Sequence, residues 1–213
     1  MIGSAIELWR YPASSFGGER QPALEIGEAG AAGDRLFGLV EAATGEPARP
    51  DREAKWHKVP LVRSRLSPAG GLEIALPGAD WVPAPSAESD AALSHLLGFP
   101  VTLRPFSRDA ASGFSGPLTA PRYAKAPIHL LTTASLARLK ALHPEGDPDP
   151  RRFRPSVLVE MDAVEGRFPE SDWIGRRLAI GEVELTVSDH CRRCAFTIIA
   201  QEGIGHDAEI LRT

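Results

Sequence analysis

The chain has 213 residues and a mass of 22.9 kDa, enough for one large domain or two small ones whose core needs no disulfides. Its hydrophobic fraction of 43 % is that of a folded globular protein, and its net charge of −4 argues against a general nucleic-acid binder. No apolar run reaches the ~18–20 residues of a membrane span, no signal-peptide pattern opens the chain, and two cysteines favour a reducing, cytoplasmic location.

The first half of the chain is predicted to consist mainly of short strands. Runs of β-prone residues alternate there with turn signals built from glycine, proline and polar residues. Strands are expected at residues 6–11, 24–26, 36–40, 59–65, 71–76 and 101–106, with 59–65 and 71–76 paired as an antiparallel hairpin. A helix is expected at 89–97, because its leucines share one side and Gly98 follows.

Residues 107–126 divide the chain by composition. They are rich in Ser, Gly, Ala and Pro, which predicts a linker or mobile loop between a β-rich region at 1–106 and a second region at 127–213. In the second region, strand-like runs are expected at residues 128–131, 157–159, 176–180, 181–187 and 196–199. Thr132 to Ser135 are predicted to cap a helix that runs to about Leu142.

This pattern predicts an α+β fold that is mainly β. Short strands and turns with two short helices favour a closed or nearly closed β-barrel, accompanied by a smaller N-terminal β-rich subdomain, over a doubly wound sheet.

Both cysteines lie in one segment, His190-Cys191-Arg192-Arg193-Cys194. A neighbouring guanidinium lowers the pKa of a thiol, and the thiolate is the form that attacks electrophiles or binds metal. The spacing suits a dithiol redox pair or half of a zinc site, to which His190 would add one ligand. No second Cys-x-x-Cys exists, and two packed cysteines at a strand end are the purely structural alternative.

Arginine dominates the basic residues, with 20 Arg against 4 Lys. Its planar fork binds phosphate and carboxylate through two hydrogen bonds. Arg151, Arg152 and Arg154 precede a predicted strand and form either an anion-holding edge or a solvated run of charge. Asp34 adjoins Arg35, which it is expected to orient as an ion pair.

Several segments, taken in order along the chain, resemble the MOSC domain family, named after the C-terminal domain of molybdenum cofactor sulfurases. They are Tyr11-Pro12-Ala13-Ser14-Ser15, residues 30–37 with Gly30-x-x-Gly33-Asp34-Arg35, Phe153-Arg154-Pro155-Ser156, residues 173–181, and Arg193-Cys194. By this resemblance, residues 1–106 correspond to the family's N-terminal β-rich region and 127–213 to the MOSC domain itself. Relatives continue with a few more strands beyond the position of Thr213.

The resemblance implies a molybdenum–pterin cofactor. Cys194 takes the position of the family cysteine that ligates molybdenum, which agrees with the preference of soft metals for thiolate. The cofactor-binding positions implied are Arg35, Arg154, Ser15, Thr133 and Ser156. Two residues depart from the family pattern: Ser14 stands where relatives often have Lys, and Ser156 stands where they have Asn.

Three functions follow as hypotheses. The first, by similarity to the amidoxime-reducing component group, is an oxidoreductase that reduces N-hydroxylated small molecules with electrons from a partner protein. The second is a sulfur carrier that accepts sulfur from a cysteine desulfurase as a persulfide on Cys194, with Cys191 as resolving thiol. The third is a non-enzymatic MOSC-like binding protein, motivated by Ser14 and Ser156. No zinc, flavin, haem or NAD motif is seen, and neither a nucleic-acid nor a membrane partner is expected.

Overall fold

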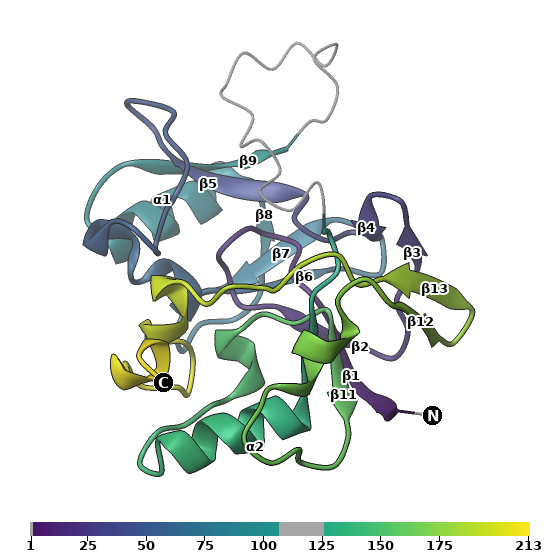
Figure 1. The fold of residues 1–213 in the computed structure, drawn as a ribbon. Helices are drawn as coiled ribbons and strands as arrows, with labels where there is room; N and C mark the ends of the chain where they lie inside the picture. The colour runs from purple at the N-terminus through teal and green to yellow at the C-terminus, as the bar shows by residue number, and fades with distance from the viewer. Residues whose placement is uncertain (1, 107–125) are drawn as a thin grey trace.

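The computed structural model describes residues 2–106 and 126–213, so almost all of the predicted linker at 107–126 lies outside the described residues. The described residues form short strands in several small sheets, together with two α-helices (Figure 1). Among these helices, none combines the length and the apolar character that crossing a bilayer requires.

A four-stranded sheet joins the two halves of the chain. Its strands are β1 (Ser4–Arg10), β2 (Glu19–Gln21), β10 (Leu130–Thr132) and β11 (Val157–Glu160). They lie in the order β10-β11-β1-β2, in which β1 is antiparallel to β11 and β2, while β10 is parallel to β11. Strands from both predicted regions therefore share one sheet, and the division at residues 107–126 stays a prediction.

The first half adds two small sheets and one helix, seen above β1 and β11 in Figure 1. Its elements are β5 (Phe37–Glu41), β6 (Arg63–Leu66), β7 (Leu72–Ala75), β8 (Val82–Ala84), α1 (Ala87–Leu97) and β9 (Val101–Pro105). Strand β5 pairs with β9, and β6-β7-β8 form an antiparallel sheet that includes the predicted hairpin. Between these sheets and α1 lies a hydrophobic core with fully buried Phe16, Trp56 and Leu93.

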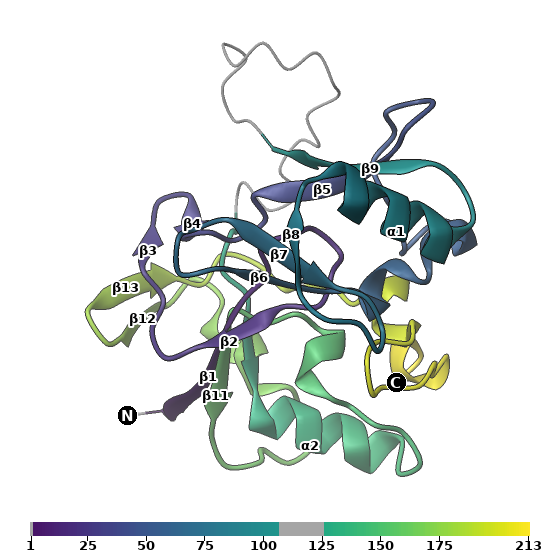
Figure 2. The ribbon, with the colours of Figure 1, turned by 180° about the vertical axis from the view of Figure 1, so that it is seen from behind.

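Local sequence signals explain both helices. Helix α1 begins at a capping box in which Ser86 and Ser89 bond reciprocally, and it ends at a left-handed Gly98. Helix α2 (Thr133–Leu142) begins after Thr132, whose side chain accepts a hydrogen bond from the Ser135 amide. Both predicted helices are thereby confirmed, and Figure 2 shows them at opposite ends of the molecule.

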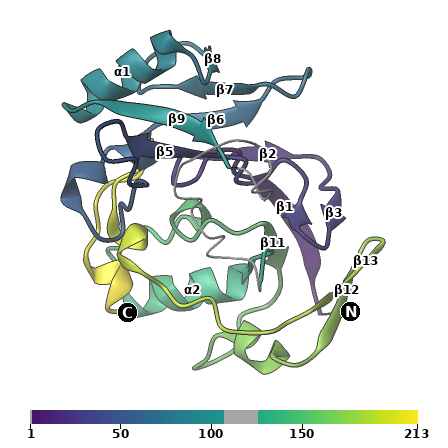
Figure 3. The ribbon, with the colours of Figure 1, turned by 90° about the horizontal axis from the view of Figure 1, so that it is seen from above.

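The remaining elements are short. Two hairpins are formed by β3 (Ile26–Gly27) with β4 (Gly30–Ala31) and by β12 (Arg177–Ile180) with β13 (Val183–Thr186). Single 3-10 turns occupy Ala54–Trp56, Val59–Leu61, Pro150–Arg152, Pro169–Trp173, Ala195–Ile198 and Glu209–Leu211. After β13 the chain runs back across the molecule toward the C-terminus, passing between the part with α1 and the part with α2 (Figures 1 and 3).

The prediction of a closed or nearly closed barrel is wrong for residues 2–106 and 126–213, although the mainly β, α+β character is confirmed. The described strands fall into separate sheets of two to four strands, and none of these sheets closes on itself. Closure requires every strand to pair along both sides. In the four-stranded sheet, β2 stops before Pro22, which has no amide hydrogen, and β10 ends at Thr132, which caps the start of α2.

The predicted strand at 196–199 is also wrong. Residues Ala195–Ile198 form a 3-10 turn, because the Cys194 carbonyl accepts hydrogen bonds from the Thr197 amide at 3.1 Å and the Thr197 hydroxyl at 2.9 Å. The side-chain hydroxyl of Thr197 thus satisfies a backbone group locally and competes with strand pairing.

Arg152 ties the C-terminal segment to the rest of the structure. Its buried guanidinium donates to the carbonyl oxygens of Asp147 at 2.7 Å, Thr197 at 3.2 Å and Gly205 at 2.8 Å. Charge-assisted hydrogen bonds of this kind are the stronger ones in proteins. Arg152 therefore acts as an internal clamp between three loops.

We expect Arg152→Met to lower the free energy of unfolding by about 3–5 kcal/mol, because the buried guanidinium loses three charge-assisted hydrogen bonds and the buried Thr197 carbonyl loses its donor. The matched control is Arg212→Met at an exposed ion pair with Glu209, where a change within about 0.5 kcal/mol is expected. Urea unfolding followed by circular dichroism measures both variants. Equal stability of the two variants would contradict the clamp.

Candidate functional site

The buried side chain of Tyr11 forms the floor of the candidate site. The Tyr11 amide donates to Asp34 Oδ1 at 2.7 Å, and the Tyr11 carbonyl accepts from the Arg35 amide at 2.8 Å. These bonds dock the Gly33-Asp34-Arg35 turn against β1. The Tyr11 hydroxyl donates to the Pro155 carbonyl at 3.3 Å. Burial raises the pKa of Tyr11 well above its usual range, so the phenol stays neutral and keeps this donor.

Two predicted arginines meet over the Tyr11 ring. The Arg154 guanidinium lies 4.1 Å from the ring centroid, and the Arg35 guanidinium lies 5.8 Å from the same centroid. Arg154 also lies 5.3 Å from the Phe196 ring and donates to the Phe16 carbonyl. Cation–π contacts on a desolvated ring hold both guanidinium groups in place. A cationic group from the first half of the chain and one from the second half therefore both lie against the same ring.

Asp34 orients Arg35. Its Oδ2 forms an ion pair with Arg35 Nη1, while its Oδ1 is held by the Tyr11 amide. Both side chains are largely buried, so the pair is screened little by solvent. This confirms the expected ion pair between adjacent residues and shows what fixes the carboxylate.

Three of the predicted site residues share a rare backbone conformation. Among the described residues, the non-glycine residues with positive φ are Ser15 at 67°, Arg35 at 51° and Arg154 at 55°. A left-handed conformation costs a non-glycine residue of order 1–3 kcal/mol, and such residues cluster at functional sites. The strain is held by surrounding contacts, for Ser15 a turn in which the Phe16 amide donates to the Ala13 carbonyl.

The segment after β13 brings the cysteines to this site. Cys191 and Cys194 are free thiols and both residues are solvent-exposed. Protein atoms around the Cys191 sulfur raise the pKa of that thiol, as does Cys194, while the Arg35 charge acts in the opposite direction. Cys191 is therefore within electrostatic reach of Arg35. The turn that follows Cys194 places Phe196 against Arg154, so the cysteine segment meets both arginines.

The arginine beside Cys194 serves another purpose. The Arg193 guanidinium donates to the Ile210 carbonyl at 2.7 Å and lies 6.0 Å from the Phe168 ring. The sequence suggested that a neighbouring guanidinium acts on the thiols, and in the structure Arg35, distant in sequence, acts on Cys191.

The predicted anion-holding edge of three arginines does not form. Arg151 makes a two-point ion pair with Asp149, at 2.9 Å from Nε and 2.7 Å from Nη2, and Arg152 is the buried clamp described above. Arg154 alone of the three reaches the Tyr11 ring. The difference arises because the 3-10 turn at Pro150–Arg152 points successive side chains in different directions.

Ser156, two residues after Arg154, is buried, and its hydroxyl accepts a hydrogen bond from the His129 amide at 3.2 Å. Its backbone extends the pairing of β1 and β11, since the Trp9 amide donates to the Ser156 carbonyl at 2.9 Å. Ser156 therefore stiffens the floor of the site.

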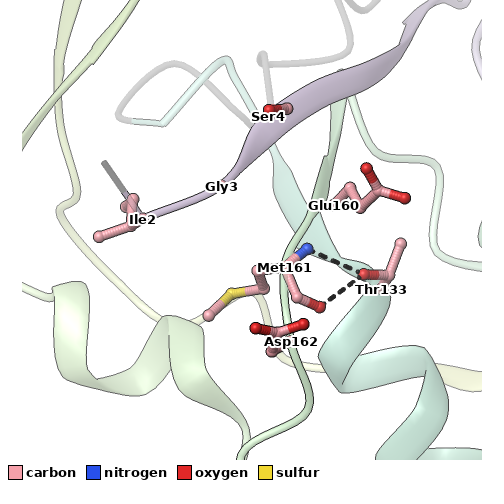
Figure 4. A pocket seen from close by; sticks show the side chains of 7 residues that line it. All are labelled: Ile2, Gly3, Ser4, Thr133, Glu160, Met161 and Asp162. Carbon is pink, nitrogen blue, oxygen red and sulfur yellow. Dashed lines mark hydrogen bonds between the residues drawn. The ribbon is translucent and has the colours of Figure 1, made fainter.

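Thr133 lies elsewhere. It follows β10, whereas Arg154 precedes β11, and these two strands run parallel, so Thr133 and Arg154 lie at opposite ends of a strand about 13 Å long. The Thr133 hydroxyl donates to the Met161 carbonyl at 3.0 Å and accepts from the Met161 amide at 3.1 Å (Figure 4). The structure does not bring Thr133 together with the arginines.

Thr133 instead lines a separate pocket of about 530 Å³. The lining residues are Ile2, Gly3, Ser4, Thr133, Glu160, Met161 and Asp162 (Figure 4). Its acidic rim does not suit a phosphate ligand, and the predicted cofactor residues other than Thr133 are not part of it.

Sequence reasoning missed three residues of the site: Tyr11, Phe196 and His129. Tyr11 stood in a quoted motif, but its position just before Pro12 gave no sign that two cations would stack on it. The His129 amide donates to the Ser156 hydroxyl, which places His129 beside the site, and burial lowers the pKa of its imidazole. The motif names Tyr11, but only the folded chain shows that its ring contacts the two arginines and that Phe196 lies against Arg154.

The arrangement suits an anion held beside a soft ligand. Two guanidinium groups supply paired donors for phosphate, and exposed thiols lie next to them. Within the described parts of the chain, no group of three or more His, Cys, Asp and Glu side chains is placed to hold a metal ion by itself. Any metal at Cys194 would therefore need ligands that are not supplied by such a cluster.

Gly33 offers a test of how the turn carrying Arg35 is held. Gly33 has φ of 81°, and an added Cβ would lie 2.7 Å from Leu66 Cδ1. Gly70 is the matched control, with φ of 83° and nothing within 4 Å of an added Cβ. We expect Gly70→Ala to lower the free energy of unfolding by about 1 kcal/mol, because alanine is strained at a positive φ. Gly33→Ala should lower it by about 1–3 kcal/mol more, because the added methyl group overpacks the turn. Urea unfolding measures both variants. Equal losses would mean that the turn is not packed tightly.

A comparison with curated proteins finds no match to this chain. A family model of the MOSC domain matches residues 107–213, which is half of the chain and includes Arg154, Cys191 and Cys194. The MOSC domain is associated with proteins that bind the molybdenum cofactor. With the order of its motifs and the meeting of Arg35 and Arg154 beside the cysteines, the chain belongs to the MOSC domain family.

Proposed function

We propose that this protein is a molybdenum-cofactor-binding oxidoreductase that reduces N-hydroxylated small molecules with electrons from a partner protein. One observation carries the proposal. Arg35 and Arg154 gather on the Tyr11 ring directly beside the segment that holds the exposed thiols Cys191 and Cys194. A metal–pterin phosphate cofactor requires two things of a protein: a binding site for its phosphate anion and a ligand for its soft metal.

The donor set fits this cofactor in chemical type. Thiolate sulfur is a suitable ligand for a soft metal centre, and Cys194 is free and exposed. The guanidinium groups of Arg35 and Arg154 match a phosphate dianion, and Asp34 fixes the direction of Arg35. Ser156 offers a hydroxyl at the buried edge of the site, already bonded to the His129 amide.

Each residue has a distinct part in the proposed reaction. Cys194 would hold the metal, Arg35 and Arg154 would hold the phosphate, and Ser15 would contribute a hydroxyl from its left-handed turn. The bound cofactor would supply the two-electron chemistry that reduction of an N–O bond requires. The exposure of Cys194 leaves access for a small substrate and for an electron-donor protein.

The first test is the metal content of the full chain made in a host that supplies the cofactor. We expect near-stoichiometric molybdenum by elemental analysis, and pterin by fluorescence after oxidation. Cys194→Ser should lower the molybdenum content about tenfold or more, because a hydroxyl is a poor ligand for a soft metal. Cys191→Ser is the matched control and should keep its metal.

Two results would contradict the assignment. Full molybdenum occupancy of folded Cys194→Ser would remove Cys194 as the ligand. Neither metal nor pterin on the folded wild-type protein would favour a MOSC-like protein that binds another anion.

A second function, sulfur transfer, is favoured by the two free thiols in one exposed segment. The Cys194 thiolate would attack the terminal sulfur of a desulfurase persulfide and take that sulfur atom, releasing the desulfurase thiol. The Cys191 thiolate would then attack Cys194, forming a disulfide and releasing hydrosulfide.

Mass spectrometry after incubation with a cysteine desulfurase and cysteine tests this function. One added sulfur atom is expected on Cys194, and it should persist longer in Cys191→Ser because the resolving thiol is absent. Cys194→Ser should carry no added sulfur. Sulfur on Cys191 alone, or on neither residue, would exclude Cys194 as the carrier.

A further inference from the structure

The backbone is held by hydrogen bonds on both sides of Cys194. Just before it, the Arg193 guanidinium donates to the Ile210 carbonyl at 2.7 Å, and Ile210 is buried in the C-terminal turn Glu209–Leu211. Just after it, the Cys194 carbonyl accepts hydrogen bonds from the Thr197 hydroxyl at 2.9 Å and the Thr197 amide at 3.1 Å. Cys194 therefore lies between two anchors.

The anchor after Cys194 is continuous with the interior of the fold. Thr197 is buried, and its carbonyl accepts a hydrogen bond from the buried Arg152 guanidinium at 3.2 Å. One residue earlier, the Phe196 ring lies 5.3 Å from the Arg154 guanidinium. The turn that follows Cys194 is therefore fixed both to the internal clamp and to an arginine of the candidate site.

The C-terminal segment contacts the chain before and after Cys194. Ile210 in this segment accepts the hydrogen bond from Arg193, and the Asp207 amide donates to the Ile198 carbonyl at 3.0 Å. One segment therefore holds both ends of the stretch that carries the thiol.

The conformation of Cys194 agrees with this arrangement. Its backbone is extended, with φ of −122° and ψ of 176°. Successive side chains of an extended backbone point in opposite directions. Accordingly, Arg193 is directed to the Ile210 carbonyl, whereas Cys194 is exposed to solvent.

We propose that Arg193 and Thr197 are positioning residues that hold the Cys194 backbone in one conformation, so that its thiol keeps a fixed position relative to Arg154. A ligand that is already ordered loses less conformational entropy when it binds a metal, so this hold strengthens metal binding. The benefit for the cofactor rests on the function proposed above, whereas the hold on Cys194 does not depend on any ligand.

The ligand-free test is the backbone order parameter of the Cys194 amide, measured by NMR relaxation on the full chain. A rigid backbone gives about 0.85 and a flexible one less than about 0.6. The wild type should give the rigid value. Thr197→Val lacks the hydroxyl, so the order parameter should fall toward the flexible value, and Thr197→Ser, which keeps the hydroxyl, should restore it. Thr186→Val, at an exposed position of β13, is the matched control.

The same measurement tests Arg193. Arg193→Gln removes the cationic donor to the Ile210 carbonyl and should also lower the Cys194 order parameter, whereas Arg193→Lys keeps a cationic donor and should restore most of it. Arg192→Gln removes the same charge from the exposed neighbour and should leave the order parameter unchanged. Circular dichroism verifies that each variant is folded.

The second readout is the rate at which protein made in a cofactor-supplying host loses molybdenum during dialysis. We expect Thr197→Val and Arg193→Gln each to lose it about fivefold faster than the wild type, and Thr197→Ser to lose it at the wild-type rate. If the wild type holds no molybdenum but the order parameter still falls in both variants, the cofactor function fails and the positioning role stands. An unchanged order parameter in both folded variants overturns the positioning role, whatever the metal content.

Discussion

The stacking of Arg154 on the buried ring of Tyr11 is the contact on which the candidate site depends. Tyr11 follows β1 from the start of the chain, and Arg154 precedes β11 in the second half, so the contact requires β1 and β11 to pair. The Tyr11 hydroxyl bond to the Pro155 carbonyl and the Trp9 bond to Ser156 extend that pairing up to the site. The shared sheet therefore sets the distance between the two arginines.

The site concentrates unfavourable features that the surrounding fold offsets. Two guanidinium groups lie against one ring, and Ser15, Arg35 and Arg154 all have left-handed backbones. Asp34 forms an ion pair with Arg35, and the aromatic rings stabilise both cations from their faces. Two positive charges on one ring favour binding of an anion such as phosphate, because both attract the same negative charge.

The helices and the hairpin could be predicted from the sequence, whereas the absence of a closed barrel among the described strands could not. The helix at 89–97 and the hairpin of β6 and β7 follow from capping residues, glycine and alternating apolar residues within a few positions. The barrel prediction failed because closure depends on strand edges that are far apart in sequence. The strand predicted at 196–199 failed because the Thr197 hydroxyl bonds to Cys194 and favours a turn.

The sequence by itself determined the helices, most strands, the family, and the identity of Cys194, Arg35 and Arg154 as the residues to follow. Only the tertiary structure decided the roles of the arginines: Arg152 holds backbone carbonyls inside the fold, whereas Arg154 lies against the Tyr11 ring at the site. It also separated Thr133 from the arginines and added Tyr11 and His129. The reason is that hydrogen bonds and cation–π contacts act over a few ångströms, and chain folding alone decides which residues come that close.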